Sequence, residues 1–248
     1  MFRAGRVSRM LQHGMPEGFK GVFKINIVGS TGSGKTAFMK RILGDLFKPQ
    51  SDVVRRSNTE NKVDSTHTWF RVGSAKSQDH ESTTTLSLNT AGILLVRTLF
   101  NSIEFHGPNE VENLMQRDDI EEIYKLNFFD NAGQERFDFM PDITMRGSDA
   151  VIIIVDGTNM GSVGKVNYFL ELIRDEESQK NEENTIPIII LLNKADLLEH
   201  GCYIGLDSIK HMISARADLH ETSMVTGEGV DDSIRTLVSH LYEKSHSN

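Results

Sequence analysis

A glycine-rich turn between an apolar strand and a helix is the feature of this sequence that most limits the folds open to it. The turn runs from Gly29 to Thr36 with the spacing G-x-x-x-x-G-K-T. Residues 22–28 before it read as a buried strand, and residues 36–47 after it read as a helix with one apolar stripe. Glycines let successive backbone N–H groups point inward, and the helix adds the positive end of its dipole. The turn is therefore predicted to bind phosphate groups.

Two side chains of this turn carry further chemistry. Lys35 would place a full positive charge between the outer phosphates of a nucleotide, and the Thr36 hydroxyl would ligate Mg²⁺. The backbone and side chains predicted to surround the phosphates are those of Gly29, Ser30, Thr31, Gly32, Ser33, Gly34, Lys35, Thr36 and Ala37. The turn indicates a phosphate site and leaves the base undetermined.

Strands and helices alternate along the rest of the chain. Strands are expected over 86–96, 124–129, 150–155 and 186–192, and helices over 163–177, 205–214 and 230–244. The runs 152–154 and 188–191 are apolar at every position, which indicates strands buried on both faces of a sheet. The predicted fold class is α/β, a P-loop NTPase with a doubly wound, mostly parallel central sheet flanked by helices.

The identity of the base is indicated by Asn193-Lys194-Ala195-Asp196, directly after the last of these strands. The Asp196 carboxylate would accept hydrogen bonds from the N1–H and the exocyclic amine of guanine. Adenine lacks this donor pair and would leave the carboxylate unpaired, which is costly in a buried site. The stem of Lys194 would lie on the purine face, and Asn193 would brace neighbouring loops. Guanine is therefore the predicted base.

A third motif, Asp130-Asn131-Ala132-Gly133-Gln134-Glu135, also follows a strand. Asp130 is expected to hold Mg²⁺ through water, and the Gly133 N–H to meet a γ-phosphate oxygen. Gln134 would orient the water that attacks the γ-phosphate. Together with Lys35, Gln134 is the predicted catalytic residue.

These motifs resemble those of Ras-superfamily small GTPases, and they are most similar to those of Rab- and Arf-like members. Residues 130–137 are similar to the D-x-A-G-Q-E-R-F signature, with Asn131 where Thr is usual. The resemblance implies a switch threonine that ligates Mg²⁺ only when γ-phosphate is present. Of Thr83, Thr84 and Thr85, the pattern of residues 85–89 favours Thr85, with Thr84 second.

The resemblance also implies a second contact with the base. Residues 221–224 are similar to the family's E-T-S-A loop, so the backbone of Ser223 and Met224 is expected at guanine O6. Because that contact comes from backbone N–H groups, Met224 in place of alanine is tolerable.

The function that follows from these motifs is a GTP/GDP switch with slow hydrolysis. Thr31 stands where an activating protein's arginine must approach, so the resemblance implies slow intrinsic turnover and help from GTPase-activating, exchange-factor and effector proteins. One alternative is a scaffold that holds GTP or GDP without useful turnover. Such a scaffold would have the same binding motifs as a hydrolysing switch, and only Gln134 speaks against it. An ATP-using P-loop kinase is the other, and Asp196 speaks against it.

The domain organisation is predicted as an N-terminal basic extension over 1–20 and a GTPase domain over 21–245. Two segments exceed a minimal domain, at about 48–82 and 100–120, and Asn109 with Glu112 indicates a short helix in the second. Asp118, Asp119, Glu121 and Glu122 are expected to form a solvated acidic face.

Composition bears on partners and location. The net charge of −8 disfavours a nucleic-acid partner, and one cysteine in 248 residues suits a reducing compartment. No apolar run is long enough to span a bilayer, and neither end carries a lipidation signal. A cytoplasmic protein is expected. The basic extension could be a frayed, solvated terminus, or it could contact a membrane surface. Contact with a membrane through a partner protein is also left open.

Overall fold

The computed structural model describes residues 18–43, 73–74, 88–107, 110–131, 145–179, 185–211, 213 and 217–246. Its strands are β1 (Phe19–Val28), β2 (Gly73–Ser74), β3 (Leu88–Thr98), β4 (Ile103–His106), β5 (Ile120–Asn131), β6 (Ala150–Asp156), β7 (Ile188–Asn193) and β8 (Asp218–Thr222). Its helices are α1 (Lys35–Leu43), α2 (Val111–Leu114), α4 (Met160–Gly164), α5 (Val166–Gln179), α6 (Leu206–Lys210), α7 (Val230–His246) and the 3₁₀ helix η5 (Ala195–His200).

The described strands form one eight-stranded, mostly parallel sheet. Its order is β2-β3-β5-β1-β6-β7-β8, and β4 pairs with β3 beside this path. Neighbouring strands run parallel along the path β5-β1-β6-β7-β8. At the other edge, β2, β3 and β4 pair antiparallel. This arrangement confirms the predicted fold class.

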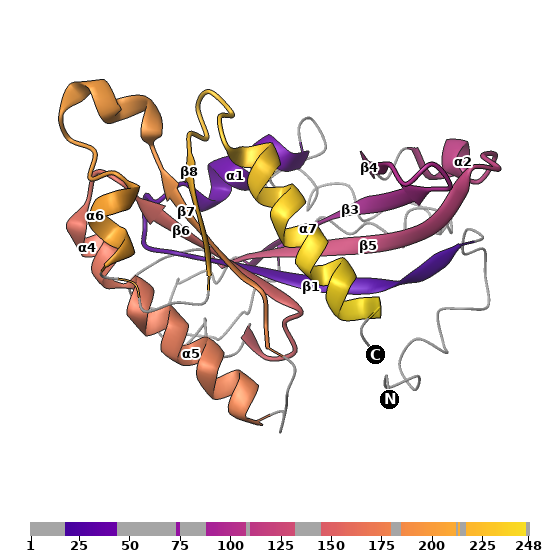
Figure 1. The fold of residues 1–248 in the computed structure, drawn as a ribbon, viewed down its shortest axis with the longest axis horizontal. Coiled ribbons are helices and arrows are strands. Elements are labelled where there is room, and N and C mark those ends of the chain that lie inside the picture. The colour runs from indigo at the N-terminus through magenta and orange to yellow at the C-terminus, as the bar shows by residue number, and fades with distance from the viewer. Residues whose placement is uncertain are drawn as a thin grey trace, which may run out of the picture.

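Helices cover both faces of the sheet (Figure 1). On one face, apolar residues of α1 and α7 pack with Ile152 and Ile154 of β6. On the other, residues of α4, α5 and α6 pack with Val151, Ile153 and Val155 of the same strand. Because successive side chains of a strand point to opposite faces, a strand between two helical layers must be apolar at every position. All seven residues of β6 and all six of β7 are buried, as the unbroken apolar runs predicted.

Some elements differ from the sequence prediction. The helix expected over 163–177 is two helices, α4 and α5, separated at Lys165 directly after Gly164, a residue that weakens helix interiors. The helix expected over 205–214 is the shorter α6. Strands β2, β4 and β8 were not predicted, because they are short, and β4 and β8 are also incompletely buried.

The segment over 100–120 is an integral part of this fold. Strand β4 pairs with β3, and the predicted short helix is present as α2. Glu110 is the N-cap of α2 and makes no side-chain cap hydrogen bond, while Asn109 lies outside the described residues. Val111 and Leu114 of α2 pack on β3 and β5 in a third apolar cluster, so the segment has its own core contact with the sheet.

Charged side chains in and after this segment are mostly paired. Arg117 donates hydrogen bonds to Glu104 at 2.6 Å and to Asp119 at 2.7 Å, and the Arg117 bond helps to lower the pKa of Glu104 to about 2. Glu121 is exposed, but Glu122 is buried beside Arg97. The expectation of a solvated acidic face is therefore wrong for Glu122, because β5 turns its side chain toward α7.

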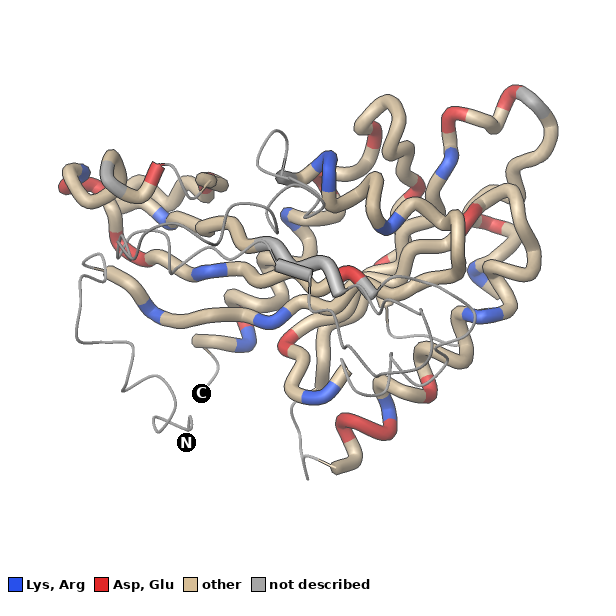
Figure 2. The backbone as a smooth tube through the Cα atoms, turned by 180° about the vertical axis from the view of Figure 1, so that it is seen from behind, with Lys and Arg blue, Asp and Glu red and all other residues tan. Residues whose placement is uncertain are grey.

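Basic and acidic residues are interspersed along the described backbone (Figure 2). Within that part of the chain, no helix combines the length and the apolar composition needed to cross a bilayer.

Truncating Leu114 to alanine tests whether α2 is needed for stability. Leu114 is 2% exposed, so Leu114→Ala should lower the free energy of unfolding by about 2–5 kcal/mol in urea denaturation. The neighbouring Met115 is 48% exposed, and Met115→Ala should change it by less than about 0.5 kcal/mol. Equal stability of the two variants would contradict the packing role of α2.

Candidate functional site

Polar residues gather at the carboxyl edge of the parallel strands. Asp130 lies near the end of β5, Asp156 ends β6 and Asn193 ends β7. In register, Asp156 pairs with Asn193, which in turn pairs with Thr222 at the end of β8. Strand β1 runs into the turn of residues 29–36, the phosphate loop, at the same edge (Figure 1). Ligands of open α/β sheets bind at this edge.

The phosphate loop curls around the ammonium of Lys35. The Nζ atom donates to the carbonyl oxygens of Gly29 and Ser30, each at 2.9 Å. Lys35 is 6% exposed; burial lowers the pKa of its ammonium, and nearby Asp130 opposes this effect. Gly29, Gly32 and Gly34 have positive φ angles of 149°, 77° and 110°, a backbone region that favours glycine. The loop thus holds a buried cation within a curled backbone, which suits an anionic ligand.

Two of the three predicted magnesium ligands lie together. The Thr36 hydroxyl donates to Asp130 Oδ2 at 3.2 Å, and Asp130 is fully buried. A hydroxyl and a carboxylate are hard oxygen donors of the kind Mg²⁺ takes, so this pair fits the ion. The third, Thr85, lies outside the described residues, as do Thr83 and Thr84.

The side chain of Asn193 connects two loops. Its Nδ2 donates to the Ser33 carbonyl oxygen at 2.8 Å, and its Oδ1 accepts from the Met224 N–H at 3.0 Å. A β-carbon at position 34 would lie 2.2 Å from the same Nδ2, so glycine at that position is required for this approach. The expectation that Asn193 braces neighbouring loops agrees with these contacts.

Asp196 is held by the loop of residues 223–228. The Ser223 hydroxyl donates to Asp196 Oδ1 at 2.6 Å and accepts from the N–H groups of Val225 and Thr226. One carboxylate oxygen is therefore fixed in orientation by a buried serine. The Met224 N–H, expected at guanine O6, is directed to Asn193 in this structure, and its contact with a base stays a prediction.

The structure adds two residues that the sequence analysis did not select. Asp156 Oδ2 accepts from Lys194 Nζ at 2.5 Å, and the Ser162 hydroxyl lies 2.6 Å from that of Ser30. Asp156 directly follows the predicted strand 150–155, the same position after a strand that identified Asn193, so the pattern held a signal for it. Ser162 lies on a helix with no distinguishing motif, and only the structure shows it.

The predicted catalytic glutamine, Gln134, and the predicted γ-phosphate contact, Gly133, lie outside the described residues. The remaining predicted residues belong to this edge of the sheet, where Thr31 and Thr36 are exposed on the phosphate loop.

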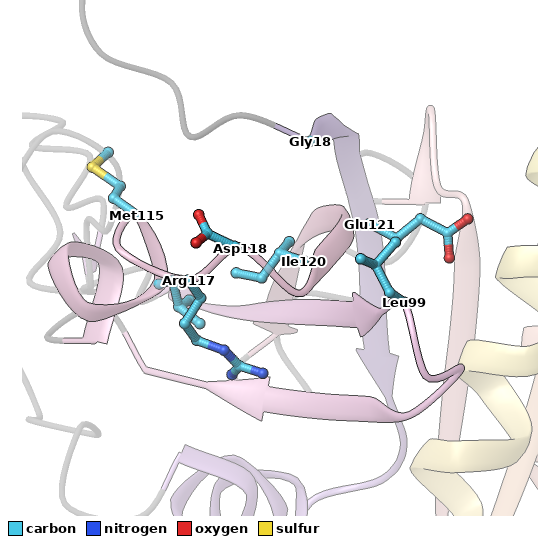
Figure 3. A pocket seen from close by; sticks show the side chains of 8 residues that line it. Gly18, Leu99, Met115, Arg117, Asp118, Ile120 and Glu121 are labelled. Atoms are coloured by element: carbon cyan, nitrogen blue, oxygen red, sulfur yellow. The ribbon is translucent and has the colours of Figure 1, made fainter.

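A cavity of about 490 Å³ lies at the opposite end of the sheet, where β1 begins (Figure 3). Leu99, Leu114, Met115, Ile120 and the charged Arg117 and Asp118 are among the residues that line it. The cavity belongs to the segment around α2 and is separate from the phosphate loop.

The fold and the phosphate loop define a nucleotide-binding α/β protein of the P-loop class. A model of the Ras family matches residues 107–243, more than half of the chain. The chain therefore belongs to the Ras family of small GTPases. Because the match begins after the phosphate loop, the loop geometry and the family assignment are independent observations.

Several relatives of this chain are Rab-type proteins. It is 33% identical over 108 residues to Ras-related protein Rab-4 of Dictyostelium discoideum, covering 44% of this chain and 50% of the relative. It is 29% identical over 120 residues to GTP-binding protein YPT1 of Saccharomyces cerevisiae, covering 48% and 55%. It is 26% identical over 130 residues to Ypt/Rab-type GTPase ypt7 of Schizosaccharomyces pombe, covering 52% and 63%. The matched part thus spans about half to just under two thirds of these relatives' length.

Replacing Lys35 should separate ligand binding from stability. A lysine whose pKa is lowered by folding destabilises the folded state at every pH below its folded pKa. Lys35→Met keeps the stem and removes the buried charge, so its unfolding temperature without nucleotide should be no lower than that of the wild type. Excess GTP·Mg²⁺ should stabilise the wild type, by about 2.7 kcal/mol at 100 times the Kd, and stabilise Lys35→Met far less.

Thermal unfolding with and without nucleotide measures both effects. Lys40 lies on the same helix and is exposed, so Lys40→Met is the matched control and should keep the nucleotide effect. A large loss of stability in nucleotide-free Lys35→Met would contradict this interpretation of the buried charge.

Proposed function

We propose that this chain is a GTP/GDP molecular switch that binds GTP with Mg²⁺ and hydrolyses it slowly to GDP and phosphate. The observation that carries the proposal is the double contact of Asn193 with the Ser33 carbonyl and the Met224 N–H. These bonds set the distance between the phosphate loop and the residues proposed to read the base, so both ends of one nucleotide would be held by a single rigid unit.

The base would be selected by Asp196. Its carboxylate has one oxygen oriented by Ser223 and would accept from the N1–H and exocyclic amine of guanine. Lys194 would lie along the purine face, and the backbone of Ser223 and Met224 would approach O6. An adenine nucleotide would leave the Asp196 carboxylate without donors, which is the argument against an ATP-using kinase.

The phosphates would be held by the phosphate loop. Its N–H groups and the first turn of α1 would face the phosphate oxygens, and Lys35 would turn from the Gly29 and Ser30 carbonyls to the outer phosphates. Thr36 and Thr85 would hold Mg²⁺ directly and Asp130 through water. The ion would neutralise charge that develops on the phosphates.

Hydrolysis and switching are proposed from residues outside the described part of the chain. Gln134 would orient the attacking water, while Thr85 and the Gly133 N–H would contact the γ-phosphate and lose these contacts when it leaves. The segments carrying Thr85 and Gly133 would then change the surface seen by partners. Thr31 is exposed on the phosphate loop, where an activating protein's arginine would have to pass, which supports slow turnover.

Membership of the Ras family supports regulation by GTPase-activating and exchange-factor proteins, and effectors that bind the GTP state. We propose a cytoplasmic protein with peripheral membrane contact as one mode of recruitment, since several of its relatives are Rab-type proteins.

Changing Asp196 tests the base assignment. Asp196→Asn replaces an acceptor-only group with an amide that donates and accepts, so it should lower GDP affinity by roughly 100-fold or more and favour xanthosine diphosphate. Glu199 lies exposed on the same helix η5, and Glu199→Gln should leave both affinities unchanged. Competition binding with a fluorescent nucleotide measures the ratio. Unchanged base preference in Asp196→Asn would remove the guanine proposal.

Changing Gln134 tests turnover. In single-turnover assays Gln134→Leu should slow GTP hydrolysis by at least about 10-fold while GDP affinity stays constant. Gln116→Leu, at an exposed glutamine beside α2, is the matched control and should hydrolyse at the wild-type rate. An unaltered rate in Gln134→Leu would end its catalytic assignment. No hydrolysis by the wild type would favour the scaffold that holds nucleotide without turnover.

A further inference from the structure

Residues 156–162, from the last residue of β6 into the first turn of α4, contact both the phosphate loop and the residues that end and follow β7. We call this segment the bridging turn. Its first residue, Asp156, pairs in register with Asn193, and the Gly157 N–H donates to the Asn193 carbonyl at 3.0 Å. On the far side, the Gly157 carbonyl accepts from the Ile204 N–H at 2.8 Å. The turn is thus fixed between the end of β7 and the loop before α6.

The Asp156 carboxylate is oriented within its own turn. Oδ1 accepts from the Thr158 N–H at 2.9 Å and from the Thr158 hydroxyl at 2.6 Å. Oδ2 is left to accept from Lys194 Nζ at 2.5 Å. Burial raises the pKa of this carboxyl, but the bonds from Lys194 and Thr158 outweigh it and bring the pKa below its ordinary value. The group is therefore an ionised acceptor whose direction does not depend on Lys194.

Lys194 needs such an acceptor. A lysine side chain loses rotamer entropy when it is held in one conformation. Its side chain is 32% exposed, and its backbone has a φ of 74°, which is uncommon for a residue other than glycine and marks a constrained position. Because Asp156 holds the ammonium, the Lys194 stem is already ordered. A base that packs on this stem would therefore lose less side-chain entropy on binding.

Ser162 carries the contact to the phosphate loop. It is buried, its hydroxyl accepts from the Asp156 N–H at 2.9 Å, and it shares a hydrogen bond of 2.6 Å with the Ser30 hydroxyl. Ser30 also offers the carbonyl that accepts from Lys35. One short turn thus contacts the loop proposed for the phosphates and the lysine proposed for the base.

We propose that Asp156 and Ser162 are positioning residues of the nucleotide site: Asp156 holds Lys194 along the purine face, and Ser162 fixes the bridging turn to Ser30 of the phosphate loop. This inference rests on the proposed function, because it assigns the residues that order that same site. Asp156 acts through Lys194 and touches no base edge. Its effect must therefore be the same for any purine that Asp196 accepts.

Removing the charge of Asp156 gives a specific pattern of rates. Asp156→Asn should speed dissociation of GDP and of inosine diphosphate by the same factor, about 10-fold, because both purines offer the same face to Lys194. Asp156→Glu keeps the charge and should recover part of the loss. Asp207 forms an exposed pair with Lys210, and Asp207→Asn is the matched control that should not alter either rate.

A double-mutant cycle distinguishes positioning from general support of the fold. In a Lys194→Ala background, Asp156→Asn should add less than about twofold, since its target is already gone. Lys194→Met keeps the stem and removes the ammonium, so it should speed dissociation as Asp156→Asn does. Full additivity in the cycle, or wild-type dissociation from Lys194→Met, would overturn the role of Asp156. The Lys194→Met measurement decides this even where the Asp156 variants fold poorly.

The Ser162 contact is tested in the same way. Ser162→Ala should speed GDP dissociation severalfold, and adding Ser30→Ala should change it little further, whereas Ser178→Ala on the exposed side of α5 should have no effect. Additive effects of Ser162→Ala and Ser30→Ala would overturn the bridge. The base-preference test with Asp196→Asn stands apart from these rates, so a failure of the proposed function and a failure of this inference are recognised separately.

Discussion

The site depends on the two hydrogen bonds made by the side-chain amide of Asn193. This amide donates to the phosphate loop and accepts from the loop of residues 223–228, two segments about 190 residues apart in the chain. An amide does both with one planar group, whereas a carboxylate only accepts and an ammonium only donates. The close approach needs Gly34, since a β-carbon there would meet the same nitrogen at 2.2 Å. The spacing of the proposed phosphate and base subsites is therefore set by contacts within the protein itself.

The double-sided core makes this spacing rigid. Strands β6 and β7 are buried along their whole length, so the two residues at their ends, Asp156 and Asn193, project from a platform packed on both faces. Such close-packed layers resist small displacements. The bridging turn is connected to this rigid sheet edge and to the phosphate loop, because it forms hydrogen bonds with the end of β7 and with Ser30.

The buried central strands and the phosphate loop could be predicted from the sequence, because unbroken apolar runs and glycine spacing are local patterns. They located β6, β7 and the phosphate loop, and the rule that polar residues follow strands located Asp130 and Asn193. Strand β8 was missed because its pairing with β7 gives stability that its polar residues do not reveal. The contact of Lys194 with Asp156 joins residues 38 positions apart, and the sequence holds both partners without showing that they meet.

The contacts of the proposed nucleotide site are of two kinds. Lys35 and Thr36 bond to groups of the protein itself, and the proposed phosphate and Mg²⁺ contacts would replace those bonds, so their contribution to affinity would be a difference between two bonded states. The bonds of Asn193 to Ser33 and of Asp156 to Lys194 would lie beside a bound nucleotide and would be kept. In the proposed switch, the difference in affinity between GTP and GDP would come from contacts with the γ-phosphate, which are proposed for Thr85 and the Gly133 N–H. Residues of the second kind should set a constant background of affinity shared by GTP and GDP. A switch needs both, because a large constant affinity keeps the site filled while a small difference distinguishes its two states.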